Sequence, residues 1–504
     1  MKKLFILPLG GLLLLAGCDF LKKDPLTSIT STNFFNTASD AESSLTAVYD
    51  ALQGGGLYGQ DYYTIGEMPS DNCTSSNADV NALRTITWTP STNQVGNLFR
   101  QCYLAINRAN VVIKYVPGVT MDATRRNQIV GEALFVRGLC YFQLVRAYGD
   151  VPLRLLPTEG STPAEVNLPR TATADVYTQI VADLQQAATQ MPASNPNRAA
   201  KNAANGILTR VQLTQRNWAA AQTAANAVIT NNVALNASFK SLFPAENKGA
   251  ESLFEIQYAG TADGNDLIAD EVLPLPFATY SYPKFNVPTA ELIAFADTVN
   301  DKRWAFNGAI NSSAGKYVGR DHVSYIDAKN PNTTGANAND RGPFVFKWTS
   351  IGNGFNSVDN CYVLRYAEVL LNYAEAVNEQ TGPSTDVLAK LNLVRQRAGL
   401  AALTTGSTQA ASKQTMRAEI ERQRRLEFAF EGERWWDLVR YARHTIADAS
   451  AVHTITALDL ISSKHSTGTA PNLVPGPRDP NYLLFPLPQY EINTNTNLKQ
   501  NPGY

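Results

Sequence analysis

The chain has few of the residues that build metal and disulfide sites, with four histidines and five cysteines in 504 positions. The histidines show no HExxH motif and no paired ligand spacing, and the cysteines show no CxxC spacing. A metallohydrolase, a zinc site and a disulfide scaffold are therefore not expected, and no metal or cofactor is indicated. The residues concerned are His322, His444, His453, His465, Cys18, Cys73, Cys102, Cys140 and Cys361.

The chain also lacks an excess of either charge. It has 43 basic and 44 acidic residues, and removal of a leader containing Lys2 and Lys3 leaves 41 against 44, a net charge of −3. A protein that binds a phosphate backbone needs a basic surface. Nucleic acid is therefore not an expected partner.

No linker, low-complexity tract or block of like charge divides the chain. Its length alone would suit about three domains, but its 44% apolar and 17% charged residues are well mixed and can bury one large core. Beyond the N-terminal leader, no run of 18 apolar residues follows that could span a membrane. The sequence thus predicts a single domain over residues 39–504.

The N-terminus resembles the signal of a bacterial lipoprotein. Two lysines precede an apolar run over residues 4–15, which is too short for a stop-transfer helix, and the run ends in LAGC. This ending resembles a lipobox, in which the thiol of the cysteine, here Cys18, takes a diacylglycerol. We expect residues 1–17 to be a signal peptide and residues 18–38 to be the lipidated cysteine and an extended tether. An ordinary secretory leader that ends near a cysteine is the alternative.

Apolar residues recur at helical spacing through much of the mature chain. The best-defined helix begins at Asp122, a good N-cap, and continues to Tyr148, where Gly149 and Pro152 end it. Its broad apolar stripe predicts burial against several neighbours. The other main helices are expected over residues 39–52, 97–115, 175–191, 203–216, 218–229, 363–379, 386–398 and 415–430.

Residues 203–229 resemble a tetratricopeptide hairpin, with an aromatic residue and several alanines that allow two helices to pack closely. The period does not repeat cleanly, and about four imperfect hairpins are expected. The sequence thus predicts an all-α dominated fold of tetratricopeptide-like helical hairpins with few short strands. The hairpins occupy about residues 39–235 and 361–443, and a C-terminal segment covers 444–504.

Two stretches show little helical period, namely residues 57–96 and the longer insertion 243–360. The insertion is rich in glycine, asparagine, proline and aromatic residues. Long irregular insertions are usually functional or disordered, and the aromatic content argues against disorder. Residues 263–266 faintly suggest a calcium loop, but the ligand spacing fails. We therefore expect ligand-binding loops in the insertion.

The segment 415–443 combines heavy charge with heavy aromatic content. Its charges recur at three- and four-residue steps, which places opposite charges within reach on one helical face. Gly432 predicts a break between two helices. Glu431, Glu433 and Asp437 are candidate acid/base carboxylates, but a structural joint satisfied by arginines is favoured. The charged face comprises Arg424, Glu427, Glu431 and Arg434.

Five motifs, in order, resemble the SusD/RagB family of surface nutrient-binding lipoproteins. They are the lipobox, GEALFVRGLCYFQLVRAYGDVPL, LRYAEVLLNYAEAVNE, RRLEFAFEGERWWDL and the ending YLLFPLPQYEINTNTNLKQNPGY. The match covers nearly the whole mature chain, so the chain is identified as a member. In this family the motifs belong to the scaffold. The signature residues are Arg425, Glu427, Glu431, Gly432, Arg434, Trp436, Asp437 and Arg440.

The resemblance implies a non-enzymatic protein, lipid-anchored on the outer face of the outer membrane. Family members cap a SusC-like TonB-dependent transporter and deliver oligomers to it, so the expected partners are that transporter, an oligosaccharide and the membrane. The tether over residues 19–30 can reach at most ~40 Å when extended. That reach suits a hinged lid.

The ligand site of the family uses aromatic side chains as stacking platforms, together with a few Asp, Asn and Arg hydrogen-bonding groups. One group is expected from the loop after the first helix and another from the insertion. The departure here is Phe99, which stands where many members have a tryptophan. The predicted ligand residues are Asp71, Asn72, Arg84, Trp88, Tyr280, Tyr282 and Trp348.

Three functions remain open on the sequence. A glycan-binding lipoprotein leads, because sugar rings stack on aromatic faces while their hydroxyls bind planar polar side chains. A peptide-binding member of the same family is second. A surface glycoside hydrolase is third; it would need two carboxylates about 5 to 9 Å apart in a cleft, and no motif supports it.

The first prediction concerns the anchor. Replacing Cys18 with alanine should release the protein into soluble fractions, because the lipid thioether is the membrane attachment that the sequence indicates. Fractionation followed by immunoblotting measures this. If the variant stays in the outer membrane of cells that lack the transporter, the anchor is misassigned.

Overall fold

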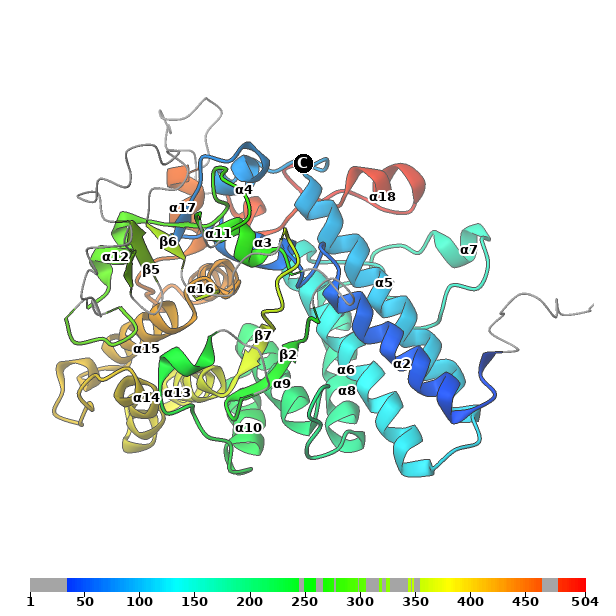
Figure 1. The fold of residues 1–504 in the computed structure, drawn as a ribbon, viewed down its shortest axis with the longest axis horizontal. Coiled ribbons are helices and arrows are strands. Elements are labelled where there is room, and N and C mark those ends of the chain that lie inside the picture. Colours follow the sequence, from blue (N-terminus) through cyan, green and yellow to red (C-terminus); the bar gives the residue numbers. More distant parts are fainter. Residues whose placement is uncertain are drawn as a thin grey trace, which may run out of the picture.

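The computed structural model describes residues 34–243, 249–259, 266–275, 278–297, 299–304, 317–319, 323–326, 343–345, 347–348, 354–464 and 479–504. Helices dominate this part of the chain, and the strands are few and short (Figure 1). The all-α dominated fold class is therefore confirmed. The predicted signal peptide, Cys18, the tether and residues 263–265 of the calcium-like loop lie outside the described residues.

The elements follow the chain in this order. The helices are α2 (Ala38–Gln53), α3 (Asp61–Glu67), α4 (Asn81–Arg84), α5 (Asn93–Tyr115), α6 (Ala123–Tyr148), α7 (Pro163–Val166), α8 (Thr173–Gln190), α9 (Lys201–Thr214), α10 (Trp218–Ile229), α11 (Ile268–Val272), α12 (Ala290–Phe295), α13 (Tyr366–Thr381), α14 (Thr385–Arg397), α15 (Lys413–Phe428), α16 (Arg434–Ala447), α17 (Ala457–Lys464) and α18 (Gln489–Thr494). The strands are β1 (Cys73–Thr74), β2 (Ser252–Ile256), β3 (Val287–Pro288), β4 (Tyr317–Gly319), β5 (Val323–Ile326), β6 (Phe344–Val345) and β7 (Cys361–Arg365).

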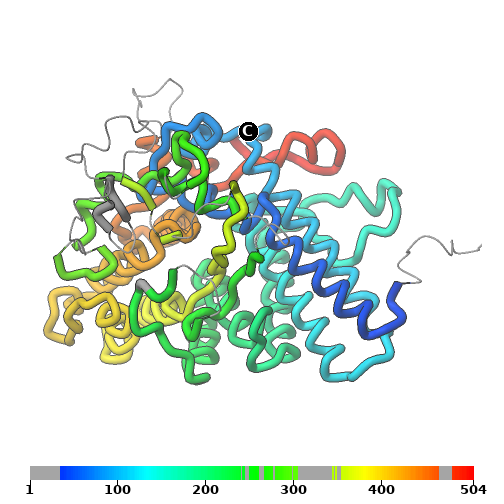
Figure 2. The backbone as a smooth tube through the Cα atoms, viewed as in Figure 1, coloured from blue at the N-terminus to red at the C-terminus, as the bar shows by residue number. Residues whose placement is uncertain are grey.

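The long helices pack against one another in chain order. α2 packs on α5, α5 on α6, α6 on α8, α8 on α9, α9 on α10, α10 on α13, and α13 on both α14 and α15. Figures 1 and 2 show this row crossing the molecule, with the irregular segments gathered along one side of it. Short connections join α5 to α6, α8 to α9, α9 to α10 and α13 to α14, and these pairs form helical hairpins of the kind that the sequence predicted.

α6, the longest helix of this row, packs on both α5 and α8. The carboxylate of Asp122 accepts the N–H of Arg125 at 2.7 Å and so caps the helix as predicted. Gly149 ends it with φ of +73°, a left-handed conformation that favours glycine. Every residue from Ile129 to Tyr148 is buried, as its broad apolar stripe indicated.

Some predicted boundaries were wrong. The first helix, expected from residue 39, begins at Ala38 and is capped by Thr37, and the side chain of Asp40 completes the capping box. The stretch 57–96, expected as a loop, contains the short helices α3 and α4. Residues 363–365, expected at the start of a helix, form the end of β7, because this buried strand pairs with β2 and the pairing overrides the helical pattern.

The strands form three small antiparallel sheets, β1–β3, β2–β7 and β4–β5–β6. The sheets β1–β3 and β2–β7 each join a part of the helical row to the insertion. In the β1–β3 sheet, Cys73 faces Pro288 and Thr74 faces Val287. This pairing holds the chain after α3 next to the insertion.

The C-terminal segment returns to the end of α6. The N–H of Phe485 donates to the carbonyl of Ala147 at 2.7 Å, and the amide of Asn501 donates to the carbonyls of Tyr148 and Phe485 at 2.9 and 2.7 Å. These contacts place α18 close to α5 (Figure 1). None of the helices in the described part of the chain is both long and apolar enough to span a membrane.

Candidate functional site

α15 and α16 meet at a sharp joint over residues 429–433. Gly432 has φ of +83° there, and a Cβ on it would lie 3.0 Å from a ring carbon of Tyr62 and 3.2 Å from Cα of Tyr63. Both the backbone conformation and the close approach require glycine. The predicted break between two helices is confirmed.

Glu427, at the C-terminal end of α15, is fully buried and accepts hydrogen bonds from three arginines. Its carboxylate oxygens lie 2.9 Å from Nη1 of Arg303 and 3.0 Å from Nη1 of Arg365, and they also contact Arg397. Burial acts to raise the pKa of Glu427, but the pull of Arg397, Arg365 and Arg303 lowers it below its usual value. The carboxylate is therefore held ionised.

Glu431 lies in the joint and is paired in the same way. It accepts hydrogen bonds from Arg365 at 2.7 and 2.9 Å and from the ammonium of Lys347 at 2.5 Å. The sequence predicted pairing between charges along one helical face, and this was wrong. The joint turns its carboxylates away from their helical neighbours, and the partners come from β7 and the insertion.

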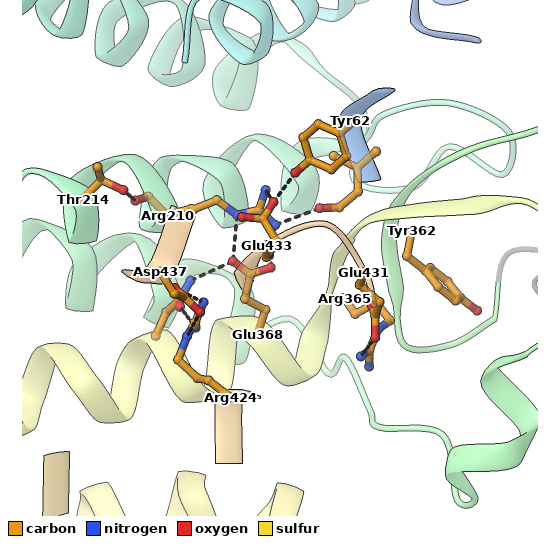
Figure 3. Close-up of polar contacts among 12 residues, drawn as sticks. Tyr62, Arg210, Thr214, Tyr362, Arg365, Glu368, Arg424, Glu431, Glu433 and Asp437 are labelled. Atoms are coloured by element: carbon orange, nitrogen blue, oxygen red, sulfur yellow. Dashed lines mark hydrogen bonds and ion pairs between the residues drawn. The ribbon is translucent and has the colours of Figure 1, made fainter. Parts of the chain in front are cut away.

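Glu433, which immediately precedes α16, binds the helical row (Figure 3). Its carboxylate accepts hydrogen bonds from Arg146 of α6 at 3.0 Å and Arg210 of α9 at 2.8 Å, and it also contacts the hydroxyl of Tyr62. Arg210 donates on its other side to Glu368 of α13 at 2.7 Å. This cluster therefore ties α3, α6, α9 and α13 to the joint.

The candidate acid/base carboxylates all belong to this joint. Asp437 accepts hydrogen bonds from Arg424 at 3.1 Å and Arg440 at 2.9 Å, and Glu431 and Glu433 are paired as described above. Burial opposes ionisation of Asp437, but the two arginines lower its pKa below the usual value. All three carboxylates are buried and satisfied by cations. This is the geometry of the arginine-paired structural joint that the sequence favoured.

Two of the predicted ligand residues, Asp71 and Asn72, also contact this joint. The Asp71 carboxylate accepts hydrogen bonds from both Nε and Nη2 of Arg434 at 2.8 Å, and the side-chain oxygen of Asn72 accepts one from Nε of Arg425 at 3.0 Å. Asn72 donates in turn to Glu67 at 3.2 Å. The scaffold thus occupies the polar groups that we expected to bind ligand.

Both predicted tryptophans lie in the core. The indole N–H of Trp88 donates to the hydroxyl of Tyr504 at 2.6 Å, and its ring meets Phe485 edge-on at 4.6 Å between centroids. Trp348 meets Tyr63 edge-on at 5.5 Å. Trp88 is 2% exposed and Trp348 is 1% exposed, so neither presents a ring face at the surface.

The two predicted tyrosines lie at the surface together with a third aromatic residue, Phe355. Tyr280 is 52% exposed and stacks on Phe355 with 5.6 Å between ring centroids and 22° between planes. Tyr282 lies 6.2 Å from the same phenylalanine, and its hydroxyl donates to the carbonyl of Asp270 at 2.8 Å. We call Tyr280, Tyr282 and Phe355 the aromatic platform.

Sequence reasoning missed Phe355, which lies in a turn between glycine and asparagine. Its backbone has φ of +64°, and its N–H donates to the Asp270 carboxylate at 2.8 Å, while the N–H of Gly354 donates to Thr279 at 2.7 Å. The left-handed backbone is strained for a bulky residue. The sequence feature that could have indicated Phe355 is an aromatic residue inside a stretch rich in glycine and asparagine.

The segment after α3 lies directly beside the residues that connect Tyr282 to β3. The hydroxyl of Ser75 donates to the carbonyl of Lys284 at 2.6 Å, and the amide of Asn77 donates to the carbonyl of Pro283 at 2.9 Å. Arg84 ends α4 in this segment, with Nη2 donating to Asn81 at 2.6 Å. The two chain segments from which we predicted the ligand site are therefore neighbours.

Two family models match the chain, one over each part of it. A model described as "Starch-binding associating with outer membrane" matches residues 19–213, and a model described as "SusD family" matches residues 290–504. The chain is 27% identical to SusD-like protein P2 of Formosa agariphila, over the whole length of both. It is 23% identical to the starch-binding protein SusD of Bacteroides thetaiotaomicron, covering 88% of this chain and 85% of that one.

Solved structures agree with the fold. A SusD homolog from Bacteroides thetaiotaomicron superposes with a TM-score of 0.75 at 23% identity and covers 94% of this chain and 98% of its own. A laminarin-binding SusD-like protein superposes with a TM-score of 0.71 at 24% identity and covers 93% and 100%. The chain belongs to the SusD-like family of proteins.

Glu67, beneath the joint, carries a buried carboxyl group whose protonation depends on pH. It accepts the N–H of Gly432 at 3.0 Å and the amide of Asn72 at 3.2 Å. Burial raises its pKa from 4.5 to about 7, and these hydrogen bonds only partly oppose the rise. The folded chain thus keeps a proton there that the unfolded chain loses above about pH 4.5.

Replacing Glu67 with glutamine should remove this pH dependence. In the natural chain, the raised pKa stabilises the folded state. This stabilisation is fully present below the pKa of 4.5 that applies to the unfolded chain, and it is lost as the pH rises through about 7. Between pH 4 and pH 8, we expect the free energy of unfolding of the natural chain to fall by on the order of 3 kcal/mol relative to that of the variant. Urea unfolding at both pH values measures this. An unchanged difference would contradict the assignment.

Proposed function

We propose that the protein binds oligosaccharides at the cell surface and delivers them to a SusC-like TonB-dependent transporter of the outer membrane. The observation that carries the binding role is the aromatic platform, in which the ring of Tyr280 is 52% exposed and stacks on the half-buried Phe355, while most other large aromatic side chains among the described residues are buried. A flat aromatic face suits the C–H face of a sugar ring. Relatives named for starch and laminarin binding support a glycan as the ligand.

The electrostatics of the joint agree with a protein that binds its ligand without catalysing a reaction on it. The three carboxylates considered as acid/base candidates, Glu431, Glu433 and Asp437, are buried against arginines, and none of them belongs to the platform. A glycoside hydrolase needs one carboxylic acid that stays protonated and one free carboxylate across the sugar. We therefore propose a non-enzymatic protein.

Replacing Tyr280 with alanine should weaken glycan binding about tenfold, which corresponds to about 1.4 kcal/mol, because it removes the exposed ring of the platform. A glycan array with the purified mature protein identifies the ligand, and calorimetry measures the change. Tyr115, which stacks on Phe35 with 5.2 Å between centroids, is a matched control, and Tyr115→Ala should leave binding unchanged. If the Tyr280 variant and the natural chain bind the glycan with equal affinity, the platform is not the glycan-binding site.

The delivery role rests on the lipid-anchored tether predicted for residues 18–38 and on a family model described as associating with the outer membrane. The twelve residues 19–30 of this tether reach at most ~40 Å when extended, so the body can swing open over a barrel without leaving the membrane. The net charge of the whole chain is only −1. Such a balance suits a partner held by contact over a large area better than one held by charge steering.

Mild detergent extraction should therefore recover the protein with a large TonB-dependent barrel in near-equal amount. Affinity capture through a C-terminal tag, followed by quantitative mass spectrometry, measures the ratio. The Cys18→Ala variant, expressed in the same cells, shows whether the anchor is needed for the pairing. If the protein emerges alone in several detergents and glycan uptake survives deletion of the transporter, the lid role is wrong.

A further inference from the structure

A cavity of about 310 Å³ lies between α5, the connection that follows α6, and the C-terminal segment. Figure 1 shows α18 and α7 on the opposite side of the molecule from α11 and α12, between which the platform tyrosines lie in sequence. The cavity is therefore separate from the aromatic platform. Its volume is at the lower end of the range for small-molecule sites.

One wall of this cavity is aromatic. Phe99 and Tyr103 lie one helical turn apart on α5, with 4.8 Å between their ring centroids. The hydroxyl of Tyr103 donates to the carbonyl of Pro152 at 2.6 Å, which fixes the position of its ring. Val166 and Leu498 add further apolar surface to the lining.

The other walls carry charged groups that the fold does not pair with one another. Arg100 donates to the amide oxygen of Asn97 at 2.5 Å, and Arg154 donates to the backbone carbonyl of Glu165 at 2.9 Å and also to that of Val166. Neither arginine forms an ion pair with any carboxylate in the described part of the chain. Both guanidinium groups therefore retain charge and donors for a ligand.

Two acceptor-bearing side chains in the lining are also unused. Among the described residues, the carboxylate of Glu491 and the side-chain amide of Asn167 have no hydrogen-bond partner. Burial raises the pKa of Glu491, and the positive charges of Arg154 and Arg100 only partly offset this. A group that is partly desolvated and unpaired gains from a ligand that supplies hydroxyl donors.

We propose that this cavity is a second saccharide-binding site that holds one sugar residue of an oligosaccharide. The half-buried ring of Tyr103, backed by the buried Phe99, offers an apolar surface for the C–H face of a pyranose. Glu491, Asn167 and the two guanidinium groups offer acceptors and donors for its hydroxyls. A sugar needs both kinds of group at once, because its C–H face is apolar while its hydroxyls both donate and accept hydrogen bonds. The proposal rests on the proposed glycan-binding function, but not on the aromatic platform.

Protection of Arg100 from an arginine-specific reagent tests this site. The full mature protein is treated with phenylglyoxal in the presence of laminarihexaose or maltohexaose, and modification of Arg100 is quantified by peptide mass spectrometry. At a sugar concentration about ten times the dissociation constant, modification should slow about tenfold. Arg108, which is half-buried on the same helix and ion-paired with Asp50, is an internal reference whose rate of modification should not change when the sugar is added.

Variants separate the cavity from the platform. Glu491→Ala and the milder Glu491→Gln should both reduce the protection of Arg100, while Gln489→Ala on the same helix should preserve it. Tyr280→Ala should weaken binding at the platform and leave the protection intact. Circular dichroism checks that each variant is folded.

The outcomes distinguish this proposal from the proposed function. If glycan binding requires Tyr280 but neither hexasaccharide protects Arg100 in the natural chain, the cavity is not a sugar site and the platform stands. If the sugar still protects Arg100 in both Glu491 variants, the assignment of the cavity as a sugar site is also wrong. If Arg100 is protected while Tyr280→Ala changes nothing, the cavity stands and the platform is wrong.

Discussion

The fold depends on a buried ionic network at the joint between α15 and α16. Four carboxylates and four cations contact one another there, so the network is neutral as a whole. Removing one member of a buried pair usually costs about 3 to 5 kcal/mol, because the remaining charge is left unpaired in a medium of low dielectric. The members are Glu251, Asp301, Glu427, Glu431, Arg303, Lys347, Arg365 and Arg397.

These charges come from segments that are distant in the sequence. Arg365 alone binds Glu251 at 2.6 Å, Glu427 at 3.0 Å and Glu431 at 2.7 Å, and so joins β7, the start of β2, α15 and the joint. Hydrophobic contact is tolerant of small shifts, but a guanidinium fork fits its carboxylates in few orientations. The network therefore fixes how the insertion sits on the helical row, and with it the positions of the loops.

The sequence predicted the helical row well because each helix carries its own period and caps, as α6 does between Asp122 and Gly149. It predicted the joint from Gly432 and the paired charges, but it assigned the wrong partners, since these come from elements far along the chain. Burial of an aromatic ring also depends on distant neighbours. Trp88 is covered by the C-terminal segment, so no local pattern could separate it from the exposed Tyr280.

The division between scaffold and surface explains why strong motifs say little about the ligand. The residues predicted as the family signature are all buried at the joint, and the loss of any of the charged ones would leave its partners unpaired. The platform residues instead lie on turns held by backbone contacts, such as those of Phe355 and Tyr282 with Asp270. A substitution of an exposed ring there removes stacking surface without unpairing a buried group. Selection on the ligand can therefore act on the loops while the joint keeps them in place.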